Sequence, residues 1–196
     1  MAKHLTQYLK GTQTRGIIYT NRHSQGSRIY DIYTDSTWGT KNDRISFHGM
    51  VVTKCGGAIL WIAQRQKSVA LSSMEDEIMV SSESGKEAAW LEKLTTDLGE
   101  HNIQNPHIPT LYCDNLGAVD LLHDSRFHRK AKHIEIWYMF IRTDLINKGQ
   151  IKVIHIPGRD QPADILTKQL PIDILRNTAK PSGYSPEIFY LPILTY

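Results

Sequence analysis

The first half of the chain shows the alternating pattern of β-strands. From residue 28 to Asp35, apolar and polar side chains alternate, which predicts a half-buried strand that ends at Asp35-Ser36. Two more runs rich in β-forming residues follow, Phe47 to Lys54 and Ala58 to Ala63, and Gly56-Gly57 marks a turn between them. Three successive strands with short connections predict an antiparallel meander.

A helical pattern then runs from Leu71 to Leu98. Ser72 is placed to cap this helix, and Glu75 completes a Ser-x-x-Glu capping box by bonding to the cap's own amide. Glu75 and Asp76 are explained as first-turn acids that stabilise the helix dipole. Glu77 lies past the cap, at the border of the apolar face, so it is either a solvated neighbour of that face or a functional residue. Small residues recur at helical spacing, where the helix must lie close to a sheet: Ser81, Ser82, Gly85, Ala88 and Ala89.

Short strands and helices alternate in the second half. Strands are predicted at 110–113 and 151–156, and helices at 115–123 and 134–149, the latter closed by Lys148-Gly149. A last helix, capped by Asp160, is predicted to run through Asp164 to Lys168. The order βββαβα(α)βα predicts an α/β fold, in which helices flank a five-stranded mixed sheet made of three antiparallel strands and two more.

The two ends of the chain are predicted to lie outside this domain. Residues 1–11 have the pattern of a short amphipathic helix and 16–20 that of a strand, but this leader is too small to hold a core of its own. We therefore expect a leader at 1–27, the α/β domain at 28–171 and an unassigned C-terminal extension at 172–196.

Composition limits the class of protein. The 196 residues carry a net charge of +3, which is weak evidence for a polyanionic partner unless the charge is clustered. Cys55 and Cys113 are the only cysteines and form no Cys-x-x-Cys pair, which argues against a structural zinc site or a disulfide framework and favours a reducing, intracellular compartment. No apolar run approaches the roughly 18 residues of a membrane span, so we expect no contact with a membrane.

Four carboxylates are placed where they could meet. Asp35 and Asp114 end two predicted strands, and the carboxyl ends of neighbouring strands converge in open α/β sheets. Glu77 and Asp164 lie near the starts of two helices that could face the same point. Like charges raise one another's pKa, and divalent cations relieve that repulsion; oxygen ligands suit Mg²⁺ or Mn²⁺ rather than zinc. The cluster suggests two-metal phosphoryl transfer. The alternative is that each acid is an ordinary strand-end or cap residue.

A basic stretch lies between residues 125 and 133. On its own it is as well explained by a solvated face as by a binding site. Beside an acidic metal site it is better explained as a contact to a phosphate backbone. The candidate nucleic-acid-binding residues, two of them on a separate segment, are Arg65, Lys67, Arg126, Arg129, Lys130 and Lys132.

Five short motifs follow one another between residues 28 and 171. They are Tyr33-Thr34-Asp35-Ser36, Val69-Ala70-Leu71-Ser72-Ser73-Met74-Glu75-Asp76-Glu77, Tyr112-Cys113-Asp114-Asn115, Lys132-His133-Ile134 and Ala163-Asp164-Ile165-Leu166-Thr167-Lys168. Together, and in this order, they resemble the ribonuclease H domain of copia-type LTR retrotransposon polyproteins. Residues 4–12 resemble the end of the reverse transcriptase that precedes this domain, so the leader is expected to be a remnant of it.

The resemblance implies a function and a site. Its catalytic and metal-binding carboxylates fall on Asp35, Glu77, Asp114 and Asp164, with two Mg²⁺ ions (Mn²⁺ is possible) as cofactors. The implied reaction is cleavage of the RNA strand of an RNA–DNA hybrid during reverse transcription. The implied partners are the hybrid and the polymerase part of the polyprotein. The implied location is the cytoplasm, in virus-like particles, with possible nuclear access.

The chain departs from the family at two places. The family usually has Ala before the catalytic Glu and an aromatic residue after it, where this chain has Asp76 and Ile78. Asp76 would add negative charge beside the site. Cellular ribonucleases H also have a histidine on the loop before the last Asp, but residues 157–162 contain none, and His155 is assigned no catalytic role. The alternatives are a catalytically silent nucleic-acid-binding domain or a decayed retroelement domain. The Asp-Glu-Asp-Asp order disfavours another nuclease or an integrase.

Overall fold

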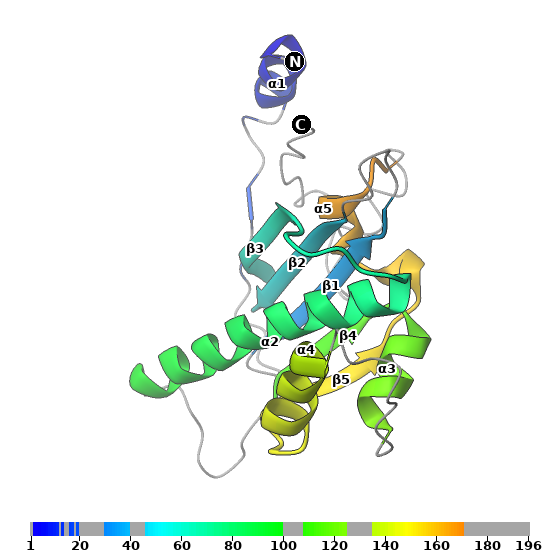
Figure 1. Cartoon of the computed structure of the whole chain (residues 1–196). Coiled ribbons are helices and arrows are strands. Elements are labelled where there is room, and N and C mark those ends of the chain that lie inside the picture. Colours follow the sequence, from blue (N-terminus) through cyan, green and yellow to red (C-terminus); the bar gives the residue numbers. More distant parts are fainter. Residues whose placement is uncertain are drawn as a thin grey trace.

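The computed structural model describes residues 2–11, 13, 16–17, 19, 30–39, 46–99, 108–124 and 135–170 (Figure 1). Its helices and strands follow the order expected for the α/β domain. They are α1 (Ala2–Gly11), β1 (Asp31–Thr37), β2 (Phe47–Lys54), β3 (Gly57–Arg65), α2 (Ser73–Asp97), β4 (Thr110–Cys113), α3 (Leu116–His123), α4 (Glu135–Met139), the π-helix η2 (Phe140–Ile146), β5 (Lys152–His155), the 3₁₀-helix η3 (Gly158–Asp160) and α5 (Asp164–Thr167). None of the helices within these ranges is long and apolar enough to cross a membrane.

The strands form one five-stranded sheet in the order β3-β2-β1-β4-β5. β2 pairs antiparallel with both β1 and β3, whereas β4 pairs parallel with β1, and β5 parallel with β4. The predicted mixed sheet of three antiparallel strands and two more is therefore confirmed. Because β1 and β4 run in the same direction, with Thr34 opposite Cys113, their carboxyl ends lie at the same edge of the sheet.

The main core lies between the sheet and the helices on one of its faces. In Figure 1, α2 lies across this face, with α3 and α4 beside it. Ile32, Met50 and Val52 of the sheet are buried here together with Ile78 of α2 and Leu111 of β4. Burial of these side chains supplies most of the hydrophobic stabilisation, at roughly 2 kcal/mol for each large side chain removed from water.

The opposite face of the sheet carries a smaller core. Val51, Ala58 and Ile165 are buried there, so α5 packs against β2 on the face away from α2. Gly49 of β2 permits this close approach, because a Cβ added to it would lie 2.8 Å from the carbonyl oxygen of Ala163. The absence of a side chain at residue 49 thus determines how near α5 comes to the sheet.

Local details of α2 differ from the sequence prediction. Ser72 caps the helix as expected, its hydroxyl accepting a hydrogen bond from the Glu75 amide (3.2 Å). The Glu75 carboxylate, however, accepts from the amide of Leu71 (2.8 Å), one residue before the cap. Gly85 does not make room for the sheet, because its added Cβ would meet Leu145 of η2 at 2.5 Å.

Three predicted elements also need correction. The helix expected at 134–149 is α-helical only through α4 and then widens into η2, where the Asn147 amide bonds to the Arg142 carbonyl (2.8 Å). Asp160 does not cap the last helix; it ends η3, and α5 begins at Asp164 without a side-chain cap. The described residues of 16–20 form no strand. The domain limits at 28 and 171 lie outside the described ranges and stay predictions.

Candidate metal centre

Asp35 lies near the end of β1 and is almost completely buried, with 1% of its surface exposed. Both of its carboxylate oxygens are held by residues of the α5 segment. Oδ2 accepts a hydrogen bond from the Thr167 hydroxyl, and Oδ1 lies 3.1 Å from the ammonium nitrogen of Lys168. The α5 segment, which Gly49 allows close to the sheet, therefore fixes the orientation of this side chain.

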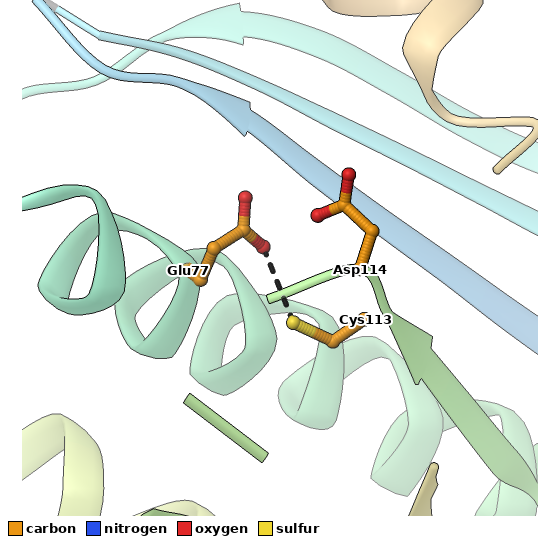
Figure 2. A group of neighbouring side chains, drawn as sticks. All are labelled: Glu77, Cys113 and Asp114. Carbon is orange, nitrogen blue, oxygen red and sulfur yellow. Dashed lines mark hydrogen bonds between the residues drawn. The ribbon is translucent and has the colours of Figure 1, made fainter. Parts of the chain in front are cut away.

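Glu77 enters the same region from the first turns of α2. Its Oε1 accepts hydrogen bonds from the amide (2.9 Å) and the hydroxyl (2.7 Å) of Ser36, the residue after Asp35. Its Oε2 accepts from the Cys113 thiol, 3.5 Å away, and Figure 2 shows the Glu77 carboxylate pointing toward Asp114. Ser36 and Cys113 thus tie α2 to the ends of β1 and β4.

Asp114 and Asp164 complete the group from the other side. Asp114 follows β4 directly and is partly buried, and its backbone carbonyl accepts from His155 Nε2 (3.2 Å). Asp164 is the first residue of α5, and its Oδ1 lies 2.7 Å from Lys168 Nζ. The buried Gln161 orients this segment, because its amide nitrogen donates to the carbonyl oxygens of Thr34 (2.8 Å) and Tyr112 (3.4 Å) on adjacent strands.

The structure brings the four predicted carboxylates together in two overlapping groups. Side-chain ligand atoms of Asp35, Asp114 and Asp164 lie within 4.8 Å of one another, as do those of Glu77, Cys113 and Asp114. Asp114 belongs to both groups. The expected convergence of the acids is therefore observed, while their catalytic and metal-binding roles stay a prediction.

The neighbouring acids on α2 point elsewhere. Glu75 bonds to the Leu71 amide at the helix start. Asp76 belongs to neither carboxylate group found among the described residues; its fully buried carboxylate lies 3.8 Å from His48 Nε2 of β2. The charge that Asp76 adds is thus directed to a histidine on the sheet rather than to the cluster.

Burial and mutual repulsion change the protonation of the cluster. Burial, with the negative charge of Asp35, raises the pKa of Glu77 from its ordinary 4.5 to about 8. Burial also raises the pKa of Asp35, although the Lys168 ammonium opposes the shift, and it raises the pKa of Asp114. Without cations Glu77 therefore holds a proton at neutral pH.

We expect the metal-free protein to lose stability as the pH rises from about 5 to about 8. The folded-state pKa of Glu77 lies above its unfolded value, so the folded protein binds more protons in this window, and its free energy of unfolding falls as the pH rises. Melting temperatures measured in chelator at pH 5.5 and pH 8 would show this loss of stability. Glu77→Gln, which stays neutral throughout, should show a smaller fall, and an equal fall in both proteins would contradict the prediction.

The donor set fits hard divalent cations. Four carboxylates offer oxygen ligands of the kind that Mg²⁺ and Mn²⁺ prefer. Among the described residues, the Cys113 sulfur lies with these carboxylates, and burial raises the pKa of its thiol above the ordinary value. A protonated thiol that donates to Glu77 is a poor ligand, since metals bind the thiolate. The site therefore favours Mg²⁺ or Mn²⁺ over zinc.

The candidate nucleic-acid-binding residues are only partly described. Arg65 ends β3, and register across β2 places it at the same end of the sheet as Thr37 of β1. Arg65 and Lys67 are both exposed. Arg126, Arg129, Lys130 and Lys132 lie outside the described residues. Among the described candidates, register thus places Arg65 at the end of the sheet where β1 carries Asp35.

Sequence reasoning missed the residues that hold the carboxylates. Three of these residues lie within the five short motifs, but their positions there predicted no role: Ser36, Thr167 and Lys168. Gln161 stood in no motif, although its complete burial beside two strand ends makes it a main support of α5. Gln161 lies between Asp160 and Pro162, outside any periodic pattern, so no signal in the sequence indicates that it supports α5.

Curated proteins similar to this chain are retrotransposon polyproteins. The Pol polyprotein from transposon RE1 of Arabidopsis thaliana is 35% identical over 182 residues, which are 92% of this chain and 12% of that protein. The Pol polyprotein from transposon TNT 1-94 of Nicotiana tabacum is 36% identical over 170 residues, 86% of this chain and again 12% of the relative. The chain thus spans about an eighth of the length of these relatives. No family model matches it.

Solved structures show the fold of the chain. The ribonuclease H1 LC11, isolated from compost by a metagenomic approach, superposes with a TM-score of 0.53 at 14% identity, over 73% of this chain and 94% of that one. The foamy viral protease-reverse transcriptase in complex with dsDNA gives 0.51 at 16% identity, over 71% and 92%. Over 92% of its length the chain is similar to one segment of the Pol polyproteins of copia-type transposons, and its fold is that of ribonuclease H.

Proposed function

We propose that this chain is a metal-dependent endoribonuclease that cleaves the RNA strand of RNA–DNA hybrids during reverse transcription of a retrotransposon. One observation carries the proposal: carboxylates from four separated elements converge at one edge of the sheet. Gathering four acids, two of them buried, is unfavourable unless cations are shared among them. Relationship to retrotransposon Pol polyproteins supports the biological setting.

Each residue of the site has a distinct part in the proposal. Asp35, Glu77, Asp114 and Asp164 would hold two Mg²⁺ or Mn²⁺ ions, with Asp114 shared between the two groups. Such ions, when bound, activate a water as nucleophile and stabilise the leaving oxygen of a phosphodiester. The chain itself contributes orientation, because Ser36 directs Glu77 toward the cluster.

The proposed partner is the hybrid duplex, together with the polymerase part of the polyprotein. A hybrid would be recognised by its shape and its 2′-hydroxyls rather than by base identity. Action during reverse transcription places the protein in the cytoplasm, in virus-like particles, with possible nuclear access.

The test is a cleavage assay on matched substrates: an RNA–DNA hybrid, double-stranded RNA and double-stranded DNA of one sequence. We expect only the hybrid to be cut, only in its RNA strand and only with Mg²⁺ or Mn²⁺; chelator should stop the reaction. Cleavage of double-stranded DNA, or cleavage that survives chelator, would refute the proposal. Binding of the hybrid without cleavage would favour the alternative of a catalytically silent nucleic-acid-binding or decayed retroelement domain.

The basic residues should supply binding energy without sequence preference. Replacing Arg126, Arg129, Lys130 and Lys132 with Ala should weaken hybrid binding and make its dependence on salt less steep, by about one unit of the log–log slope for each phosphate that the variant no longer neutralises. The measurement is a salt titration of binding with Ca²⁺ in place of Mg²⁺. Arg65→Ala with Lys67→Ala tests the edge of β3 in the same way. An unchanged slope in both variants would assign these residues to a solvated face.

A further inference from the structure

Lys168 lies directly on the oxygens of the acidic cluster. Its ammonium nitrogen is 3.1 Å from Asp35 Oδ1 and 2.7 Å from Asp164 Oδ1, so one side chain bridges β1 and the first residue of α5. Its backbone amide also bonds to the Asp164 carbonyl (2.9 Å), which anchors the bridging residue at the end of α5. The ammonium is the positive charge that the pair of acids shares.

This position conflicts with a divalent cation. Asp35 and Asp164 also belong to the group of three acids whose oxygens lie within 4.8 Å of one another. Two positive charges held a few ångströms apart repel each other strongly when they are shielded from bulk water. The ammonium and a metal ion therefore compete for the same oxygens.

The Lys168 ammonium can move away from the carboxylate oxygens into solvent. The Lys168 side chain remains 36% exposed, whereas the Asp35 side chain is 1% exposed, so the ammonium faces solvent on one side and the buried carboxylate does not. A lysine has four rotatable side-chain bonds and a strongly hydrated ammonium, so it can turn into water without displacement of the backbone. The Asp35 carboxylate, which also accepts a hydrogen bond from the Thr167 hydroxyl, would stay in place.

We propose that Lys168 is a positioning residue: in the metal-free protein its ammonium holds Asp35 and Asp164 in the arrangement that receives metal, and it leaves these oxygens when divalent cations bind. The inference rests on the proposed function in that these acids are the metal ligands. It predicts opposite effects of removing the charge, because loss of the ammonium weakens the metal-free site and frees its oxygens for the metal.

The test compares Lys168→Met with Lys148→Met. Lys148 makes a bridge of the same spacing to Asp144, at 2.8 Å, but both side chains are exposed and belong to no metal-ligand group among the described residues. In chelator at pH 8, Lys168→Met should melt roughly 3 °C or more below Lys148→Met. In calorimetric titrations with Mn²⁺, Lys168→Met should bind about tenfold more tightly than wild type, whereas Lys148→Met should be unchanged. Lys168→Arg, which keeps the charge, should restore both wild-type values.

A melting temperature no lower than that of Lys148→Met, or an Mn²⁺ affinity that is unchanged or weaker, would overturn the inference. If Lys168→Met does not fold, wild-type protein labelled with ¹³C-lysine provides the test. The ε-methylene signal of Lys168 is identified by its loss in Lys168→Arg. On addition of Mg²⁺ this signal should shift to that of a solvated lysine. A fixed signal would overturn the inference. A wild-type chain that binds Mn²⁺ without cutting hybrid refutes the proposed function and leaves the Lys168 measurements valid.

Discussion

Replacing Asp35 with asparagine is expected to lower the rate of hybrid cleavage by about a thousandfold or more, the equivalent of roughly 4 kcal/mol in activation free energy. The asparagine keeps the shape of the side chain and can still accept from Thr167, but it removes the charge that a metal ion requires. Glu77→Gln should have an effect of the same order. Hybrid binding should remain nearly intact in both variants, since the phosphate contacts are made by other residues.

Single-turnover cleavage with saturating enzyme measures this effect apart from binding. Asp144→Asn is the matched control, because Asp144 is an exposed carboxylate that pairs with Lys148 and belongs to no metal-ligand group among the described residues. Full activity in Asp35→Asn or Glu77→Gln would exclude the two-metal assignment. Loss of the folded state, judged by circular dichroism, would show that these acids are structural instead.

Gly49→Ala is expected to impair both stability and metal binding, although residue 49 touches no metal ligand through a side chain. The new Cβ would lie 2.8 Å from the Ala163 carbonyl oxygen and 3.0 Å from Leu166 Cβ. A backbone oxygen cannot rotate away, so α5 must move from the sheet and carry Asp164 and Lys168 with it. Overpacking of this kind costs about 1–3 kcal/mol of unfolding free energy, and we expect Mn²⁺ affinity to fall at least tenfold, about 1.4 kcal/mol.

Gly85→Ala is the control that separates a loss of stability from a loss of metal affinity. Its Cβ would meet only the end of a flexible side chain, Leu145 Cδ1 at 2.5 Å, on the face of α2 that packs against η2. It should change the melting temperature but leave Mn²⁺ affinity as in wild type. Denaturant unfolding and Mn²⁺ titration of both variants provide the comparison. A Gly49→Ala protein that binds Mn²⁺ like wild type would show that α5 does not depend on this contact.

The sequence was sufficient for the sheet and for the convergence of the acids. Asp35 lies near the end of one strand and Asp114 directly follows another, and these two strands pair in parallel. Their meeting therefore follows from strand direction once both strands are recognised. Glu77 could be separated from Glu75 because a capping box accounts for one acid and leaves the other unexplained. These predictions depend on local patterns, which a single sequence displays.

The supports of the site could not be predicted in this way. Gln161 bonds to Thr34, 127 residues away, and Lys168 to Asp35, 133 residues away, and no local period encodes such pairs. The prediction that Asp160 caps the last helix is wrong. Aspartate is favoured at helix N-caps, but here Asp160 ends η3, and α5 begins only at Asp164. The prediction that Asp76 lies beside the cluster is wrong, because its carboxylate lies near His48 of β2. Which face of the sheet His48 points to depends on the register of β2, and local sequence patterns do not give this register.

The bridge from Gln161 to two strand ends has a consequence for how the protein is made. A ribosome synthesises β1 well over a hundred residues before Gln161, so the first carboxylate emerges long before the segment that orients it. Closing so long a loop is entropically unfavourable until the intervening sheet has formed, which makes the α5 segment one of the last parts to dock. A nascent chain would therefore carry an unassembled centre until synthesis has passed this point, and the proposed nuclease activity would begin only when the whole domain has been completed.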